Sequence, residues 1–254
     1  MKMDKHRWSG RNSLKDNLRN KVWEQLEQSG TAIGDPWSKI PNFKGAKEAA
    51  LRLTELDFWK PARVVKSNPD SAQAWVRFYA LQAGKKVFTP VPELTKDFPF
   101  LLLDPEILLK NGIAFEEVMY SDGALLHGQR VNFKQMDPMD ICVVGSVAVS
   151  KDGGRTGKGG GFADLEMGVF RSVGTLLNEC PIVTTVSEIQ VVENDEIILE
   201  NHDTPMDWII TPKQAIETKT NLQKPGPIDW SSMQEDQFLN IPFLRELKEE
   251  LTNN

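Results

Sequence analysis

Residues 141–149, ICVVGSVAV, constrain the fold of this chain more than any other stretch. They are apolar at nearly every position rather than at every second one, which predicts a strand buried on both faces. Such strands are typical of the centre of a parallel sheet, because helices cover both faces there. We therefore expect an α/β protein with this segment near the middle of its sheet.

The rest of the chain alternates between strand-like and helix-like segments. Leucine and valine recur at four-residue spacing from Ser13 until Gly30, which is the pattern of an amphipathic helix. Further helices are expected at 44–56, 70–83, after Pro105, at 162–177 and at 242–251, and strands at 62–66, 86–91, 181–186 and 206–211. This alternation predicts a mainly parallel sheet, and parallel sheets bind ligands at the carboxyl ends of their strands.

A glycine-rich loop follows the predicted central strand. Six of the ten residues at 153–162 are glycine, and a helix is expected from Phe162 onwards. Successive glycines let backbone N–H groups converge, and a helix N-terminus beside them favours an anion. Arg155 and Lys158 add positive charge, so the favoured ligand is polyphosphate. The spacing fits neither the Walker A motif nor the dinucleotide fingerprint, and a plain glycine-rich hairpin or lid is the alternative.

Charged side chains flank this loop. Asp164 comes just inside the expected helix, where a carboxylate beside bound triphosphate suits Mg²⁺. For Glu166 we expect only a favourable interaction with the helix dipole. Lys15 and Arg19 are four residues apart and share one face of the first helix.

Composition narrows the class of protein. The 254 residues carry a net charge of −6, which makes nucleic acid an improbable partner. The two cysteines suggest neither a disulfide framework nor a zinc site, and no apolar run reaches 18 residues. The start of the chain lacks the apolar stretch of a signal peptide, so we expect a cytoplasmic protein away from membranes.

Residues 155–164, RTGKGGGFAD, resemble the R-x-G-x-G-x-G-Y-Y-D signature of the 5-formyltetrahydrofolate cyclo-ligase (methenyltetrahydrofolate synthetase) family. Lys15 and Arg19 resemble the basic pair at the family's N-terminus, and residues 200–211 resemble its acidic segment and last strand. The likeness is greatest to the methenyltetrahydrofolate synthase domain-containing subgroup. Animal members of that subgroup carry an RNA-recognition module, which we do not expect here.

The resemblance implies a three-layer α/β/α domain of the kind shared with sugar-phosphate isomerases and CoA transferases. It implies one such domain over residues 1–230, followed by an acidic tail helix within 231–254. The implied enzyme of one-carbon metabolism uses ATP and Mg²⁺ to convert 5-formyltetrahydrofolate into 5,10-methenyltetrahydrofolate. The formyl oxygen is phosphorylated first, and N10 of the folate then attacks the activated carbon.

The resemblance also assigns roles to individual residues. Lys15 and Arg19 would contact the outer phosphates, and the expected catalytic residues Arg155 and Lys158 would cradle the triphosphate together with the loop amides. The loop that cradles the nucleotide would comprise Gly157, Lys158, Gly159, Gly160, Gly161 and Phe162. Asp164 and Asp203 would hold Mg²⁺, and Asn68, Asp70 and Phe162 would bind the acceptor.

Two departures from the family pattern concern the acceptor. Asn68 stands where the family has the acid of an E-x-x-T motif, with Asp70 two residues further on, and Ala163 replaces the second tyrosine. These changes leave open a different formyl or pterin substrate, or a non-catalytic nucleotide- or RNA-binding protein. A CoA transferase or sugar-phosphate isomerase is a further alternative, because a fold does not determine a function.

Other side chains are weaker candidates. We expect His127 to be a polar loop residue, and we expect His202 to cap a turn or support the site as readily as to act in it. Trp37, Trp59 and Trp75 are candidates for a wall against a pterin ring.

Overall fold

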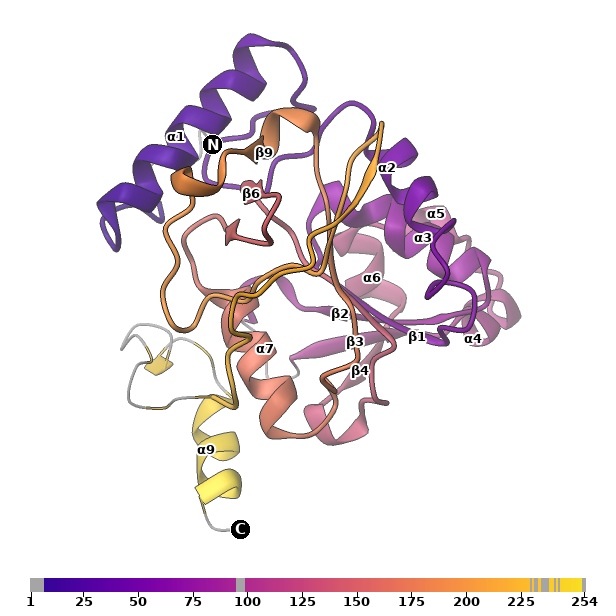
Figure 1. The fold of residues 1–254 in the computed structure, drawn as a ribbon. Helices are drawn as coiled ribbons and strands as arrows, with labels where there is room; N and C mark the ends of the chain where they lie inside the picture. The colour runs from indigo at the N-terminus through magenta and orange to yellow at the C-terminus, as the bar shows by residue number, and fades with distance from the viewer. Residues whose placement is uncertain are drawn as a thin grey trace.

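The computed structural model describes residues 7–94, 99–228, 230, 233, 238–239, 241 and 243–252 (Figure 1). Within these residues, the larger of two sheets has eight strands. In spatial order they are β11 (Ala215–Glu217), β10 (Trp208–Ile210), β8 (Ile182–Thr185), β5 (Ile141–Val143), β1 (Val64–Ser67), β2 (Lys86–Pro90), β3 (Phe100–Leu103) and β4 (Gln129–Val131).

The centre of this sheet is parallel and its edges are antiparallel. Strands β10, β8, β5, β1 and β2 run in one direction, and Val65 of β1 pairs with Val87 on one side and Ile141 on the other. Strands β3, β4 and β11 are antiparallel to their neighbours. The predicted α/β fold with a mainly parallel sheet is thus confirmed, whereas the likeness to sugar-phosphate isomerases and CoA transferases stays a prediction.

The predicted single strand at 141–149 is wrong, because the chain leaves the large sheet after Val143. Residues 148–150 form β6 (Ala148–Ser150), which pairs with β7 (Arg155–Thr156) and β9 (Val191–Val192) in a second sheet. Every residue from 141 to 150 is buried, so the apolar pattern runs unbroken through the change of sheet. At Gly145, between the strands, a Cβ would lie 2.9 Å from the Ile40 side chain.

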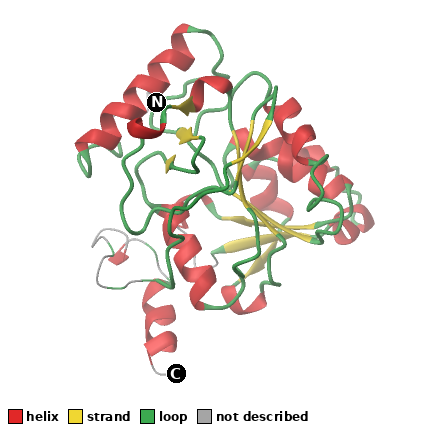
Figure 2. Ribbon diagram, viewed as in Figure 1, coloured by secondary structure: helices red, strands yellow, loops and turns green. Residues whose placement is uncertain are grey.

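The predicted helices lie close to their expected positions, and two further helices, at 115–118 and 121–127, were not predicted (Figure 2). They are α1 (Ser13–Gln28), α2 (Ala46–Leu53), α3 (Ala74–Gln82), α4 (Pro105–Lys110), α5 (Phe115–Val118), α6 (Ser121–His127), α7 (Phe162–Ser172) and α9 (Leu244–Thr252). Asn12 rather than Ser13 caps α1, since its side chain accepts from the Leu14 and Lys15 amides. Helix α7 ends at Ser172, five residues before the expected end.

Two hydrophobic cores lie on opposite faces of the large sheet. Val65 of β1 belongs to a core that includes Ala49 of α2, whereas the preceding Val64 belongs to a core that includes Phe170 of α7. Leu244 of α9 joins the second core, so the acidic helix packs against the domain. The domain boundary at residue 230 stays a prediction, and part of the tail lies outside the described residues.

Helix α1 and the small sheet form the remaining side of the molecule. Figure 1 shows α1 beside β6 and β9, and its buried residues Leu18, Val22 and Leu26 join the first core. This packing brings the basic face of α1 to the loop that follows β7. None of the described helices is long and apolar enough to span a membrane.

Candidate functional site: a cationic glycine pocket at the sheet edge

A cavity of about 640 Å³ opens where the parallel strands of the large sheet end. Its wall includes the residues that follow β1, β2 and β5, together with the start of α7. All thirteen residues predicted for the site line it: Lys15, Arg19, Asn68, Asp70, Arg155, Gly157, Lys158, Gly159, Gly160, Gly161, Phe162, Asp164 and Asp203. The structure therefore brings the predicted residues together, and their individual roles remain predictions.

The glycine loop passes close under the N-terminal segment. Gly159 has φ of 109°, and a Cβ there would lie 2.8 Å from Cβ of Trp8 and 2.9 Å from its carbonyl oxygen. Gly161 has φ of 72° and caps α7 in the left-handed conformation. Any other residue at these two positions would be strained, which accounts for the glycines at 159 and 161.

Two arginines hold the outer side of this loop. Arg19 Nε donates to the Gly157 carbonyl at 2.7 Å, and Arg11 Nη1 donates to the Gly160 carbonyl at 3.1 Å. In a trans peptide the C=O and the following N–H point in opposite directions. The amides of Lys158 and Gly161 therefore point away from these arginines. Burial lowers the pKa of Arg19, with the Asp16 carboxylate acting in the opposite direction.

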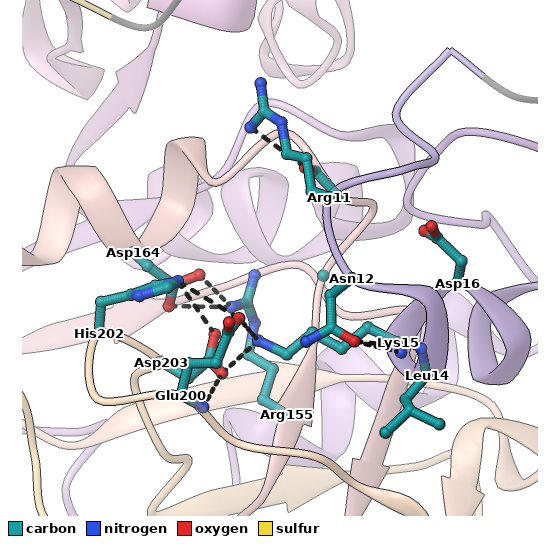
Figure 3. Close-up of polar contacts among 12 residues, drawn as sticks. Arg11, Asn12, Leu14, Lys15, Asp16, Arg155, Asp164, Glu200, His202 and Asp203 are labelled. Atoms are coloured by element: carbon teal, nitrogen blue, oxygen red, sulfur yellow. Dashed lines mark hydrogen bonds and ion pairs between the residues drawn. The ribbon is translucent and has the colours of Figure 1, made fainter. Parts of the chain in front are cut away.

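Arg155 and Asp164 form a buried ion pair. Arg155 Nη1 lies 3.2 and 3.1 Å from the two carboxylate oxygens, and Arg155 Nη2 donates to the Gly145 carbonyl at 3.0 Å. Asp164 also accepts from the Thr204 amide at 3.0 Å. The pair thus joins β7, α7 and the segment before β10 (Figure 3).

Lys15 forms further ion pairs next to the pair of Arg155 and Asp164. Its buried ammonium lies 2.7 Å from Glu200 Oε2 and 2.5 Å from Asp203 Oδ2 (Figure 3). The hydrogen bond from Lys15 lowers the pKa of Glu200. His202 Nε2 is 3.9 Å from both carboxylates, and among the described residues this group of three can offer metal ligands within 4.8 Å of one another.

Lys158 extends from the loop towards the opposite wall. Its ammonium is 3.9 Å from Asp70, and its side chain is 26% exposed. Asp70 belongs to the segment after β1, which is held from behind by fully buried Arg77. This guanidinium donates to the carbonyls of Asn68, Pro69 and Asp70, and burial lowers the pKa of Arg77 to about 10.

Sequence reasoning missed the role of Glu166 in the site. Glu166 lines the pocket, is only 3% exposed, and lies 2.6 Å from the ammonium of fully buried Lys66. Burial raises the pKa of Glu166, and Lys66 opposes this shift. The available signal was Lys66 itself, because a lysine in a strand predicted to be buried requires a charged or polar partner.

Of the weaker candidates, His202 lines the pocket, whereas the others lie elsewhere. His127 and the three tryptophans at 37, 59 and 75 are outside the pocket lining, so the predicted tryptophan wall is wrong. His127 is the last residue of α6 and not the predicted loop residue, and its Nε2 lies 3.7 Å from Glu117 Oε2. The ring that does line the pocket is Phe162, packed edge-on against Trp8 with 5.6 Å between ring centres.

The fold and pocket define an α/β protein with a pocket of glycine backbone and charged side chains at the edge of its parallel sheet. The chain belongs to the 5-formyltetrahydrofolate cyclo-ligase family, whose model matches residues 5–212.

Relatives and a solved structure agree with this assignment. The chain is 36% identical over 236 residues to the methenyltetrahydrofolate synthase domain-containing protein of Bos taurus, covering 92% of this chain and 62% of that protein. The Homo sapiens counterpart is 34% identical over 236 residues, with 92% and 61% covered. The chain thus spans less than two thirds of these relatives' length. The structure of Aquifex aeolicus 5,10-methenyltetrahydrofolate synthetase has the same fold, with a TM-score of 0.52, 17% identity, and 83% of this chain and 95% of that chain covered.

Proposed function

We propose that this protein is an ATP-dependent ligase that converts 5-formyltetrahydrofolate into 5,10-methenyltetrahydrofolate. The observation that carries the proposal is a single pocket lined by two chemically different sets of residues. One set is glycine backbone and cations, which we assign to one half of the pocket, and the other is proline, isoleucine and short polar side chains, which we assign to the other half. A ligase of this kind must hold a charged nucleotide and a flat heterocycle side by side.

The cationic half suits the triphosphate of ATP. Lys15, Arg19 and Arg155 are buried and already bonded to carboxylates or carbonyls, so they set the local charge and hold the walls. Lys158 is the partly exposed cation of the loop, and moving from Asp70 to a phosphate oxygen requires only a side-chain rotation. We propose that Lys158 contacts the transferred phosphoryl group, where fixed positive charge offsets the developing negative charge.

The other half suits a reduced pterin. Its lining residues come from four separate segments of the chain: Asn68, Asp70, Pro90, Pro92, Glu166, Pro225, Pro227 and Ile228. Rigid apolar side chains give a flat ring area to pack against at little cost in conformational entropy. The polar groups at one end can then fix its orientation.

The proposed reaction has two steps. The formyl oxygen of the folate attacks the γ-phosphorus of ATP, the bond to the β-phosphate oxygen breaks, and ADP leaves. N10 then attacks the phosphorylated formyl carbon and loses its proton, and the carbon–oxygen bond breaks to release inorganic phosphate. Both steps depend on holding the formyl oxygen in line with the phosphoryl group, which a preformed pocket supplies.

Mg²⁺ fits the acidic residues at the pocket wall. Glu200 and Asp203 already enclose one positive charge, the Lys15 ammonium, and carboxylate oxygens are the donors that Mg²⁺ prefers. We propose that Asp203 and Asp164 hold the ion together with phosphate oxygens. When bound, the ion neutralises charge on the phosphates.

One assay tests the proposal. Purified protein with MgATP and 5-formyltetrahydrofolate should give the ultraviolet absorbance of the methenyl product, with one ADP formed per product. Protein without ATP, or with a non-hydrolysable ATP analogue, is the control. No product at enzyme concentrations equal to those of substrate would refute this activity.

A second candidate is the same chemistry on another formylated pterin. It is favoured by Asn68, whose side-chain oxygen already accepts from Lys66 at 2.6 Å and which carries no charge. In that case MgATP would be hydrolysed in the presence of the other pterin but not with 5-formyltetrahydrofolate. The same phosphate-release assay, run over a panel of formylated pterins, separates the two candidates.

A further inference from the structure

The floor of the acceptor half holds a buried charge pair that the phosphate chemistry does not use. Lys66 comes from β1 and Glu166 from the second turn of α7, and the two charged groups are 2.6 Å apart. Lys66 has no exposed surface and Glu166 has 3%. Of the two, only Glu166 is part of the pocket lining.

Such a pair is costly to bury. Taking two charges out of water is unfavourable for each ion, and apolar residues of similar volume often serve stability as well or better. The neighbouring strand positions Val64 and Val65 are apolar, so β1 packs well without a charge. The pair therefore calls for an explanation beyond the stability of the fold.

Lys66 also determines which polar group of the Asn68 side chain is available to a ligand. Asn68 Oδ1 accepts from the Lys66 ammonium at 2.6 Å, which leaves the NH₂ group of Asn68 as its remaining polar group. Asn68 lines the pocket as well. The pocket floor thus offers a carboxylate that accepts hydrogen bonds and, next to it, an amide that donates them.

From this arrangement we propose that Glu166 determines which acceptor the pocket takes, by accepting hydrogen bonds from ring N–H groups of a planar heterocycle. A pterin presents adjacent N–H and NH₂ donors beside a ring carbonyl, and this edge matches Glu166 together with Asn68. The Lys66 ammonium, 2.6 Å from Glu166 Oε2, holds this carboxyl group in place. The inference rests on the proposed function, and it places the acid that the pocket needs on α7 instead of after β1.

The first test uses two ligands and the unaltered protein. One is 5-formyltetrahydrofolate, and the other is the same compound with a methyl group in place of the ring 2-amino group. Losing a hydrogen bond to a buried charged partner weakens binding about 10- to 100-fold, and that difference in KM is expected. Equal KM values for the two compounds would overturn the inference while leaving the proposed function intact.

The second test removes the carboxylate. In Glu166→Gln, the KM for 5-formyltetrahydrofolate should rise about 10- to 100-fold, while the KM for MgATP stays within about twofold. The variant should also lose its preference between the two compounds. Because Glu166→Gln leaves Lys66 buried without a counter-charge, the double variant Lys66→Met/Glu166→Gln is measured beside it as a neutral version of the same floor.

A matched control separates these effects from loss of stability. Asp140 accepts from the Arg63 and Val64 amides at the opposite end of β1, away from the pocket. Asp140→Asn should lower the melting temperature and leave both KM values unchanged. Folded variants that keep the wild-type preference between the two compounds would refute the role of Glu166. An unaltered protein that neither binds nor converts 5-formyltetrahydrofolate would instead refute the proposed function, and the inference with it.

Discussion

At the scale of single residues, the cations of the pocket differ in what they already bind. Lys15, Arg19 and Arg155 are each at most 6% exposed and contact carboxylates or carbonyls. Lys158 is 26% exposed and lies 3.9 Å from Asp70, beyond hydrogen-bonding distance. A ligand can therefore recruit Lys158 without breaking a buried contact.

Replacing this lysine should weaken nucleotide binding selectively. In Lys158→Ala, the KM for ATP is expected to rise about 10- to 100-fold, because one charge-assisted hydrogen bond to phosphate is lost. The KM for the acceptor and the melting temperature should change little. Steady-state kinetics with either substrate varied measure this, with Lys134→Ala on an exposed surface as the control. An unchanged ATP dependence would contradict the phosphate role of the loop.

Asp164 is expected to serve both the fold and the metal. Its side chain is 11% exposed, and breaking a buried pair of this kind costs about 3–5 kcal/mol. Asp164→Asn should therefore lower the free energy of unfolding in urea and raise the Mg²⁺ concentration needed for half-maximal activity. Asp137→Asn, at an ion pair that is about half exposed, should change stability by less than about 1 kcal/mol. An unaltered Mg²⁺ requirement would remove Asp164 from the metal site.

The gathering of the glycine loop and its cations at one pocket could be predicted because these residue types and their spacing are characteristic. Glycines beside Arg155 and Lys158 indicate a phosphate loop without knowledge of any partner. Glu166 gave no such signal. Its environment is created by Lys66, which is exactly 100 residues away in sequence and reaches it only through the packing of α7 on β1.

At the scale of elements, the loop from 157 to 161 depends on the N-terminal segment above it. Gly159→Ala would place a methyl group 2.8 Å from Trp8 and also demand an unfavourable φ. We expect a loss of about 1–3 kcal/mol in stability from the backbone strain and a rise of about tenfold or more in the KM for ATP as the loop shifts.

Gly174 provides the matched control for this prediction. It also has a positive φ, 75°, but a Cβ there would meet nothing within 4 Å. Gly174→Ala should lose a similar amount of stability and leave the KM for ATP unchanged. Equal kinetic effects in the two variants would show that contact with Trp8 does not position the loop.

Helix α1 is attached to residues 196–203 by ion pairs that depend on pH. Lys15 pairs with Glu200, and Lys21 pairs with Glu196. These contacts lower the pKa of both glutamates, so the pairs stabilise the folded state above the ordinary glutamate pKa of about 4.3. That stabilisation is lost as the pH falls through the lowered values.

Hydrogen exchange measures the attachment of α1 directly. Amide exchange of α1, corrected for the intrinsic pH dependence, should accelerate relative to α3 as the pH falls below about 4.3. A Glu196→Gln/Glu200→Gln double variant should show faster exchange already at neutral pH and a weaker pH dependence. Exchange in α1 that follows α3 at every pH would contradict this prediction.

Many elements could be predicted, but not β3, β4, β11, α5 and α6, and not the place where the chain changes sheets. Strands β1, β2, β8 and β10 and helix α4 lie where the local pattern placed them. The error at 141–149 has a physical reason, because β5, the turn and β6 are all buried and so share one apolar pattern. The apolar pattern of a sequence indicates which residues are buried, but it does not indicate which strand each segment pairs with.

At the scale of the whole molecule, the C-terminal helix is part of the second core. Leu244 of α9 is fully buried, and the ring of Phe243 lies 5.0 Å from that of Phe133. Leu244→Ala should reduce the free energy of unfolding by about 2–5 kcal/mol. Leu239→Ala, at a side chain that is 59% exposed, should change it by less than about 0.5 kcal/mol. Equal denaturation midpoints for the two variants would show that α9 contributes nothing to the core.

The contact between Lys15 and Glu200 joins positions 185 residues apart in the chain. During synthesis, α1 leaves the ribosome before the segment that precedes β10, and Lys15 lacks its partners Glu200 and Asp203 until that segment has emerged. Since a chain is made at about 5–20 residues per second, the interval lasts on the order of ten seconds or more. Through that time the nascent chain cannot complete the pocket, because one of its walls has not yet been made.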